Sequence, residues 1–120
     1  FKVINSIVTG YHDDEVVWTS PKNDEVCNFS FDHCVLRTEK MNTEDSLKFT
    51  NTIYENLKDT TQFGEKHFRL FDTDNFKYDF RLRKESAAIG VADAATSFPT
   101  DRRGVLRDDK PDAGCYEFDE

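Results

Sequence analysis

The residues best suited to catalysis in this 120-residue chain are Glu55, His67 and Arg69. A glutamate, a histidine and an arginine on one sheet are the side chains with which small ribonucleases move protons and stabilise charge. No histidine follows position 67, so a second catalytic histidine late in the chain is absent. The acidic composition also repels RNA. We therefore expect structural roles for these three residues and assign no catalytic residue.

The sequence contains no metal-binding or cofactor-binding motif. There is no Cys-x-x-Cys pair, and the three histidines are scattered at positions 12, 33 and 67. The segment 72–75, Asp-Thr-Asp-Asn, begins like a calcium loop, but Lys77 and Arg83 stand where an EF-hand needs glycine and glutamate. His33 adjoins Cys34, yet adjacent residues point to opposite faces of a strand. The five glycines are isolated, so no phosphate-binding loop is present. We expect no metal and no cofactor.

Basic side chains form the candidate surface for binding a partner. Lys77, Arg81 and Arg83 alternate with apolar residues, which places them on one face of a strand. A dibasic pair, Arg102 and Arg103, lies in a segment rich in turn-forming residues. Because arginine is enriched at interfaces, we predict partner binding at these five positions.

The overall charge argues against two classes of partner. The chain has 24 Asp and Glu residues against 16 Lys and Arg, a formal net charge of −8. Such a surface repels nucleic acid and anionic membranes. No run approaches the roughly 20 apolar residues that a membrane-spanning helix requires. We expect a monomer with no nucleic-acid or membrane partner.

The cysteines and a sequon favour an extracellular protein. Cys27 and Cys34 fall on opposite faces of a regular strand, so they can bond only across a turn or bulge. A Cys27–Cys115 bridge is therefore preferred, with Cys34–Cys115 next. Asn28 begins an Asn-Phe-Ser glycosylation sequon. The chain begins at Phe1 rather than Met, which fits removal of a secretory signal, although whether Phe1 is the natural N-terminus stays open.

The hydrophobic pattern predicts a mainly β protein. Strands are expected near residues 1–10, 16–19, 26–37 and 115–118, and a small, apolar strand near 87–98. Residues 67–84 form the clearest unit, an antiparallel hairpin with one apolar and one charged face around an Asp/Asn-rich turn. Residues 43–58 fit either a strand or a helix.

These elements predict one domain over residues 1–120, with a loop-rich C-terminal segment over 99–120. We find no internal repeat, and six to eight short strands favour a compact antiparallel β-sandwich or β-barrel, with one helix at 43–58 as an option.

Three short segments resemble the Alternaria major allergen family of small secreted fungal proteins of the effector and elicitor type. They are the opening strand 1–10, the Phe-Asp-Thr-Asp run at 71–74 and the Gly-Val-Ala-Asp-Ala run at 90–94. That family has four cysteines in two bridges, whereas this chain has three with different spacing. The resemblance implies a secreted β-domain, of the β-barrel type, that acts by protein binding.

Three functions follow as hypotheses. The first is a secreted, non-enzymatic domain that binds a host or partner protein. The alternative is a carbohydrate-binding module or small hydrolase that uses exposed aromatics such as Tyr11, Trp18 and Tyr116. The third is an acidic decoy that imitates nucleic acid.

Overall fold

The computed structural model describes residues 1–17, 28–40, 48–59 and 63–120. Six short strands belong to two parallel three-stranded sheets, one in the order β1-β3-β5 and the other in the order β2-β4-β6. The strands are β1 (Lys2–Ile4), β2 (Ile7–Val8), β3 (Ser30–Asp32), β4 (Val35–Leu36), β5 (Phe49–Thr50) and β6 (Ile53–Tyr54). An antiparallel hairpin of β7 (Phe68–Asp72) and β8 (Lys77–Leu82) follows a 3-10 turn, η2 (Phe63–Lys66).

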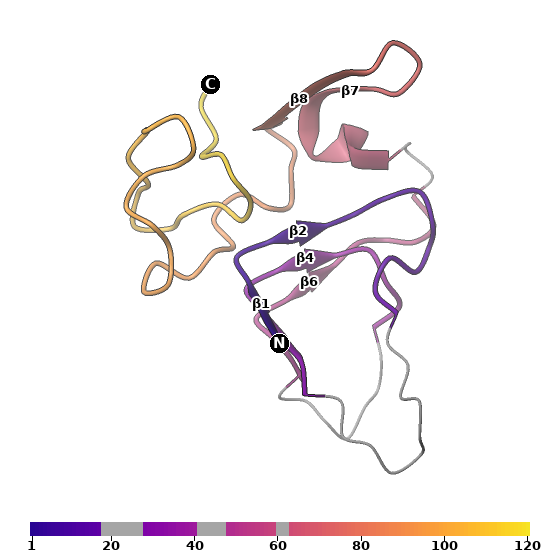
Figure 1. The fold of residues 1–120 in the computed structure, drawn as a ribbon, viewed down its shortest axis with the longest axis horizontal. Helices are drawn as coiled ribbons and strands as arrows, with labels where there is room; N and C mark the ends of the chain where they lie inside the picture. The colour runs from indigo at the N-terminus through magenta and orange to yellow at the C-terminus, as the bar shows by residue number, and fades with distance from the viewer. Residues whose placement is uncertain (18–27, 41–47, 60–62) are drawn as a thin grey trace.

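The two parallel sheets are built from three stacked coils, which are residues 2–8, 30–36 and 49–54. Each coil is a strand, a sharp corner and a second strand. Val3 pairs with Phe31, which pairs with Phe49, and the register of the second strands is the same. Figure 1 shows β2, β4 and β6 lying side by side in this stack. The expectation of no internal repeat is therefore wrong: equivalent positions recur after 28 and then 18 residues.

One residue in each coil makes the corner possible. Asn5, His33 and Asn51 hold equivalent positions and have φ angles of 51°, 52° and 48°. Asparagine and histidine are among the non-glycine residues that most often adopt this left-handed conformation. The corner between β3 and β4 also breaks the alternation expected for a single strand over 26–37. Phe31, Cys34 and Leu36 consequently share one buried cluster.

The central strand β4 of the sheet β2-β4-β6 is buried on both faces, as is usual in parallel sheets. Leu36 of β4 packs inside the coils, while its neighbour Val35 packs against Leu82, Ala88 and Ala113. The cluster that contains Val35 and Leu82 joins the coils to the hairpin and to residues 83–120. In Figure 1 these C-terminal residues lie as loops beside the coil stack.

Buried carboxylates organise residues 83–120. Asp101 accepts hydrogen bonds from the backbone N–H groups of Arg103, Val105 and Glu117, at 2.7, 3.0 and 3.1 Å. Asp112 accepts from those of Gly90 and Phe118. These carboxylates satisfy buried backbone donors that a sheet would otherwise pair.

The predicted antiparallel sandwich or barrel is wrong. Among the described residues no barrel closes, and the only antiparallel pairing besides the hairpin is an isolated bridge between Thr100 and Leu106. Alternation of apolar and polar residues indicates that a strand has one buried and one exposed face. It contains no information on whether the neighbouring strand is parallel or antiparallel. Short parallel strands therefore gave the same pattern as an antiparallel protein.

Several element predictions have clear outcomes. The hairpin within 67–84 is confirmed. The described part of 43–58 contains strands β5 and β6 and no α-helix. Residues 87–98 and 115–118 form turns and bends instead of strands, and residues 16–17 are not in a strand. Residues 18 and 19 of that strand lie outside the described part of the chain. No helix in the described part is long and apolar enough to cross a membrane.

Candidate functional site

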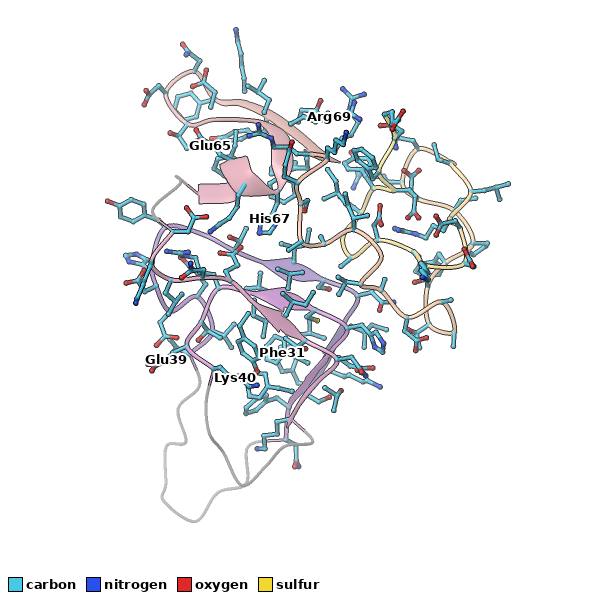
Figure 2. All side chains as sticks on the ribbon, turned by 180° about the vertical axis from the view of Figure 1, so that it is seen from behind. Phe31, Glu39, Lys40, Glu65, His67 and Arg69 are labelled. Carbon is cyan, nitrogen blue, oxygen red and sulfur yellow. The ribbon has the colours of Figure 1, made fainter. Side chains whose placement is uncertain are left out.

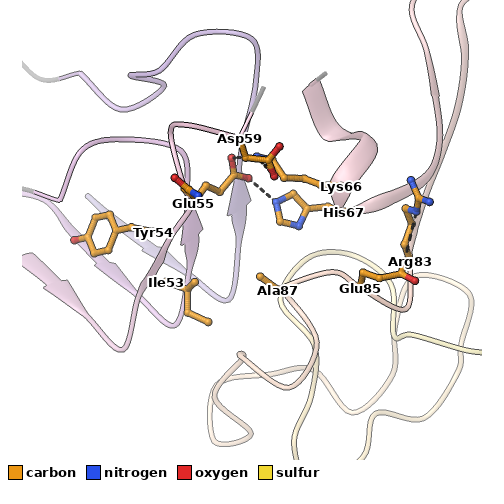
Figure 3. Close-up of a pocket in the computed structure, with 10 residues that line it drawn as sticks. Ile53, Tyr54, Glu55, Asp59, Lys66, His67, Arg83, Glu85 and Ala87 are labelled. Atoms are coloured by element: carbon orange, nitrogen blue, oxygen red, sulfur yellow. Dashed lines mark hydrogen bonds and ion pairs between the residues drawn. The ribbon is translucent and has the colours of Figure 1, made fainter. Parts of the chain in front are cut away.

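The fold brings together two of the three residues that the sequence singled out for catalysis. Nε2 of His67 lies 2.5 Å from Oε1 of Glu55, and the side chains are 2% and 3% exposed. Glu55 directly follows β6, whereas His67 lies between η2 and β7. Figure 2 places His67 between the hairpin and the coil stack, and Figure 3 shows the contact with Glu55.

Glu55 is surrounded by positive charge. Its Oε2 accepts a hydrogen bond from Arg37 at 3.3 Å and lies 3.2 Å from Nζ of Lys66. Arg37 also donates to the carboxylate of Asp13 and to the backbone carbonyl of His12. The cluster thus ties the coil stack to the start of the hairpin through buried ion pairs.

A pocket of about 420 Å³ opens beside this cluster (Figure 3). Its charged lining balances three acidic and three basic or imidazole side chains, which are Glu55, Asp59, Glu85, Lys66, Arg83 and His67. The remaining lining residues are Ile53, Tyr54, Asn56 and Ala87. The pocket therefore mixes both signs of charge, and no single sign dominates its lining.

The electrostatics do not favour acid–base catalysis by Glu55. Burial raises its pKa, but the hydrogen bond from His67 and the charges of His67 and Lys66 outweigh burial and lower the pKa to about 2. A general base works best when its pKa lies near the operating pH. Glu55 is accordingly a permanent buried anion that holds cations in place.

His67 is also fully engaged. Its Nδ1 lies 3.0 Å from Oγ of Ser86, so both ring nitrogens have partners. A serine, a histidine and a glutamate in line resemble the order of groups in a hydrolase triad. Ser86 is only 6% exposed, is not among the pocket-lining residues, and accepts a hydrogen bond from the backbone N–H of Ala88. The geometry fits a structural link better than a nucleophile.

Arg69, the third residue of the set, points elsewhere. Its guanidinium pairs with the carboxylate of Asp119 at 2.5 Å. Arg103 pairs with the same carboxylate at 2.6 Å. The hydrogen bond and charge of Arg103, with further charge from Arg69 and Arg81, lower the pKa of Asp119. These contacts fasten the C-terminal residues to the hairpin.

The five basic residues predicted to bind a partner are not one open surface. Arg81 is held by the carboxylate of Asp79 on its own strand, and Arg103 by Asp101 and Asp119. Arg83 donates to the backbone carbonyl of Glu65. Lys77 and Arg102 are exposed. Arg81 and Arg103 do converge near Asp119, but their charges are used to hold the structure together.

A group of partly exposed aromatic rings lies on the other face of the hairpin. Tyr78 and Phe80 of β8 are 43% and 44% exposed. Their ring planes are parallel within 4°, with centroids 5.8 Å apart. Phe71 of β7 meets Tyr78 edge to face at 5.1 Å and Phe80 at 6.1 Å. We call Phe71, Phe76, Tyr78 and Phe80 the aromatic face.

The sequence pattern marks this face as the apolar one, which is normally the buried face. In the structure it is buried only where the hairpin joins the rest of the protein. Leu82 is 2% exposed and belongs to the cluster with Val35 and Ala88. Figure 1 shows that the turn of the hairpin extends away from the coil stack. The pattern identified which face is apolar. It did not indicate at which residue the hairpin stops packing against the rest of the protein.

Phe76, at the end of the hairpin turn, is the most unusual member. It has a φ angle of 53° and is 82% exposed. A bulky residue in the left-handed region is a backbone outlier, and Phe76 gains little burial in return. Strained residues of this kind cluster at functional sites. The sequence signal was available, because the turn Asp-Thr-Asp-Asn is followed by phenylalanine where glycine or asparagine is usual.

Cys34 and Cys115 form no disulfide with each other in the structure, and Cys27 of the preferred Cys27–Cys115 pair is not among the described residues. Cys34 is buried and Cys115 exposed, and both are free thiols. Burial raises the pKa of the Cys34 thiol. Asn28 of the sequon is exposed.

The aromatics named for carbohydrate binding have separate surroundings. Tyr11 is 69% exposed and packs edge to face on His12. Tyr116 is half-buried with the guanidinium of Arg103 above its ring, 5.5 Å from the centroid. Trp18 lies outside the described residues.

Comparisons with protein-family models, with curated proteins and with solved structures gave no match.

Proposed function

We propose that this protein is a non-enzymatic binding module that docks a protein partner on the aromatic face of the β7–β8 hairpin. The observation that supports this most is Phe76, which exposes a large apolar ring at the hairpin tip from a strained backbone. The strain and exposure cost stability in the free protein, and a partner that covers the ring would offset that cost.

The composition of the face suits a protein partner. Aromatic side chains and arginine dominate the energetics of protein interfaces, and they cluster where water is excluded. The rings of Phe71, Tyr78 and Phe80 form one contiguous apolar surface. We therefore assign binding to these rings instead of to the five basic residues, most of which are internally paired.

A sugar is a poorer fit for the same face. Stacking on a sugar needs an open, flat ring surface. Tyr78 and Phe80 lie in an offset stack, so each covers part of the ring surface of the other. The partner that we expect is a protein with an apolar groove that accepts Phe76 and the edges of the stacked rings.

An extracellular location remains a prediction. Its support is the exposed sequon residue Asn28. The free thiols of Cys34 and Cys115 remove the argument from disulfide bonding for those two cysteines.

The test places a photoreactive phenylalanine analogue, p-benzoylphenylalanine, at position 76. We expect it to cross-link one protein from an extract of the natural surroundings, and unlabelled wild-type protein to compete for the cross-link. Affinity is then measured with the purified partner. Phe76→Asn should lower it at least tenfold, because an anchor ring is lost while asparagine accepts the backbone conformation.

Phe98→Asn provides the matched control, since Phe98 is also 82% exposed and lies outside the hairpin. It should bind as the wild type does. Equal loss in both variants, or none in Phe76→Asn, would overturn the proposal. A cross-link between two copies of this chain would show that the aromatic face binds a second copy of the protein and would overturn the proposal of a different partner.

A further inference from the structure

A second cluster of chemically active side chains lies at the corner of the middle coil, well apart in the sequence from Glu55 and His67. Asp32 ends β3, His33 forms the corner, and Asp93 belongs to the C-terminal loops. One ligand-capable atom from each of these residues lies within 4.8 Å of the other two. No spacing signal marks this set in the sequence, because Asp93 lies 60 residues beyond His33.

The loop that carries Asp93 is fixed at this corner. The backbone N–H of Asp93 donates to Oδ1 of Asn5, the corner residue of the first coil, at 2.9 Å. The amide group of Asn5 donates in turn to Thr96 and Ser97 of the same loop. The position of Asp93 beside His33 is therefore held by contacts that do not involve its own carboxylate.

The imidazole of His33 supplies the observation that points to a ligand. Its Nδ1 is buried and makes no hydrogen bond within the described residues. The atom lies 3.0 Å from Oδ1 of Asp32, which pairs with it when the imidazole is protonated. A neutral imidazole nitrogen beside a carboxylate oxygen is also an arrangement in which both groups can donate lone pairs to one cation.

The carboxylate of Asp32 is positioned in the way that metal ligands usually are. Its Oδ1 accepts hydrogen bonds from the hydroxyl of Thr50 at 2.6 Å and from the side-chain amide of Asn51 at 3.1 Å. Outer partners of this kind orient ligands and hold their charge. Within the described residues, neither Asp32 nor Asp93 forms an ion pair with lysine or arginine.

We propose that Asp32, His33 and Asp93 bind a divalent transition-metal ion of the zinc type. One imidazole nitrogen and two carboxylate oxygens form a donor set that suits zinc, whereas calcium and magnesium prefer oxygen ligands alone. Tetrahedral zinc with ligands at about 2.1 Å separates them by roughly 3.4 Å, so the ligand atoms, which lie within 4.8 Å of one another, have to draw together when the ion binds. The three residues are half-buried, which leaves the fourth position for water.

The bound ion cross-links the middle coil to the C-terminal loops. It adds a link between segments 60 residues apart at the edge where Asn5 already holds the loop. Since metal bound to the folded state stabilises it by mass action, zinc is expected to raise the unfolding temperature.

The chain offers an unusually conservative variant for the test. His33→Asn installs the residue that already forms the corners at positions 5 and 51, so the left-handed backbone is kept while the imidazole is removed. Asp93→Asn is the second variant, because an amide oxygen still accepts the hydrogen bond that Ala95 donates to Oδ1. His12→Asn removes an exposed histidine outside the cluster and is the control.

Chelator-treated full-length protein is titrated calorimetrically with Zn²⁺, and its unfolding temperature is followed with Zn²⁺, Mg²⁺ and Ca²⁺. We expect Zn²⁺ binding that is weakened at least tenfold in His33→Asn and in Asp93→Asn and unchanged in His12→Asn, with no shift from Mg²⁺. Absence of Zn²⁺ binding, or equal binding by wild type and both cluster variants, would overturn the proposal. Each variant's unfolding temperature with chelator present verifies its fold.

Discussion

The 2.5 Å contact between Nε2 of His67 and Oε1 of Glu55 joins the two halves of this molecule. Glu55 belongs to the third coil of the parallel stack and His67 to the entry of the antiparallel hairpin. Arg37 and Lys66 complete the buried charge balance around the carboxylate. The relationship explains how two sheet systems with no shared strand keep a fixed orientation.

Removal of the Glu55 charge is therefore expected to be strongly destabilising. In Glu55→Gln the cations of Arg37 and Lys66 lose the buried carboxylate that they share and keep only the more exposed Asp13 and Asp59, and breaking a buried pair costs about 3–5 kcal/mol. The measurement is the free energy of unfolding in urea. Glu85→Gln is the control, since Glu85 lines the same pocket but its side chain is 74% exposed. We expect it to change stability by less than about 0.5 kcal/mol, and equal effects of the two substitutions would contradict this role of Glu55.

The lowered pKa of Glu55 predicts that the folded protein loses stability in acid. Folding lowers the pKa of Glu55 from 4.5 to about 2. A lowered pKa contributes stability that is complete above the unfolded value and is lost as the pH falls from about 4.5 towards about 2. At about 1.4 kcal/mol for each pKa unit, the contribution is roughly 3 kcal/mol. Urea unfolding at a series of pH values should show a smaller loss between pH 6 and pH 3 in Glu55→Gln than in the wild type, and parallel curves would disprove the assignment.

We expect substitution of a corner asparagine to lower stability when the new residue is branched at Cβ or lacks a polar group. Asn51 has a φ angle of 48° and donates a hydrogen bond to Asp32. Asn51→Ala should cost about 1–2 kcal/mol, because the left-handed conformation is unfavourable for alanine. Asn51→Gly should cost less, since glycine adopts it freely. Thermal unfolding of the two variants decides the matter, and a more stable alanine variant would refute the strain argument.

The conformation of Phe76 at the hairpin tip is predicted to lower the free energy of unfolding of the protein. Phe76→Gly removes a residue with a φ angle of 53° from a conformation that glycine tolerates, so the variant should be about 0.5–1 kcal/mol more stable than the wild type. Phe98→Gly is matched in exposure and is expected to give no such gain. Denaturant unfolding measures both. A destabilised Phe76→Gly hairpin would mean that the ring contributes to folding and weakens its assignment to binding.

Asp101 is expected to control the order of the C-terminal loops. Its carboxylate, with a side chain 0% exposed, accepts backbone hydrogen bonds from positions 103, 105 and 117. Asp101→Ala leaves these donors unpaired, so amide hydrogen exchange should accelerate at residues 103–117 before it does in the coils. Asp109→Ala, on an exposed residue, is the comparison. Uniform exchange in both variants would show that the loops are held by other contacts.

The sequence by itself determined the local structure that follows from side-chain pattern and turn chemistry. Alternation around an Asp/Asn-rich turn was sufficient for the hairpin, and β-branched and aromatic residues were sufficient for strands near positions 2–8 and 30–36, whereas positions 49–54 fitted either a strand or a helix. These features depend on residues close together in the chain, so they can be recognised without knowing what packs against them.

Only the tertiary structure decided how those strands pair and which side chains meet. Parallel pairing depends on the stacking of corners at Asn5, His33 and Asn51, whose spacings of 28 and 18 residues are too irregular to reveal a repeat. Glu55 and His67 were named from the sequence, but their contact requires the hairpin to fold onto the coils. Asp93 reaches His33 only because the C-terminal loops cover the coil corner, and such long-range contacts leave no periodic trace in the chain.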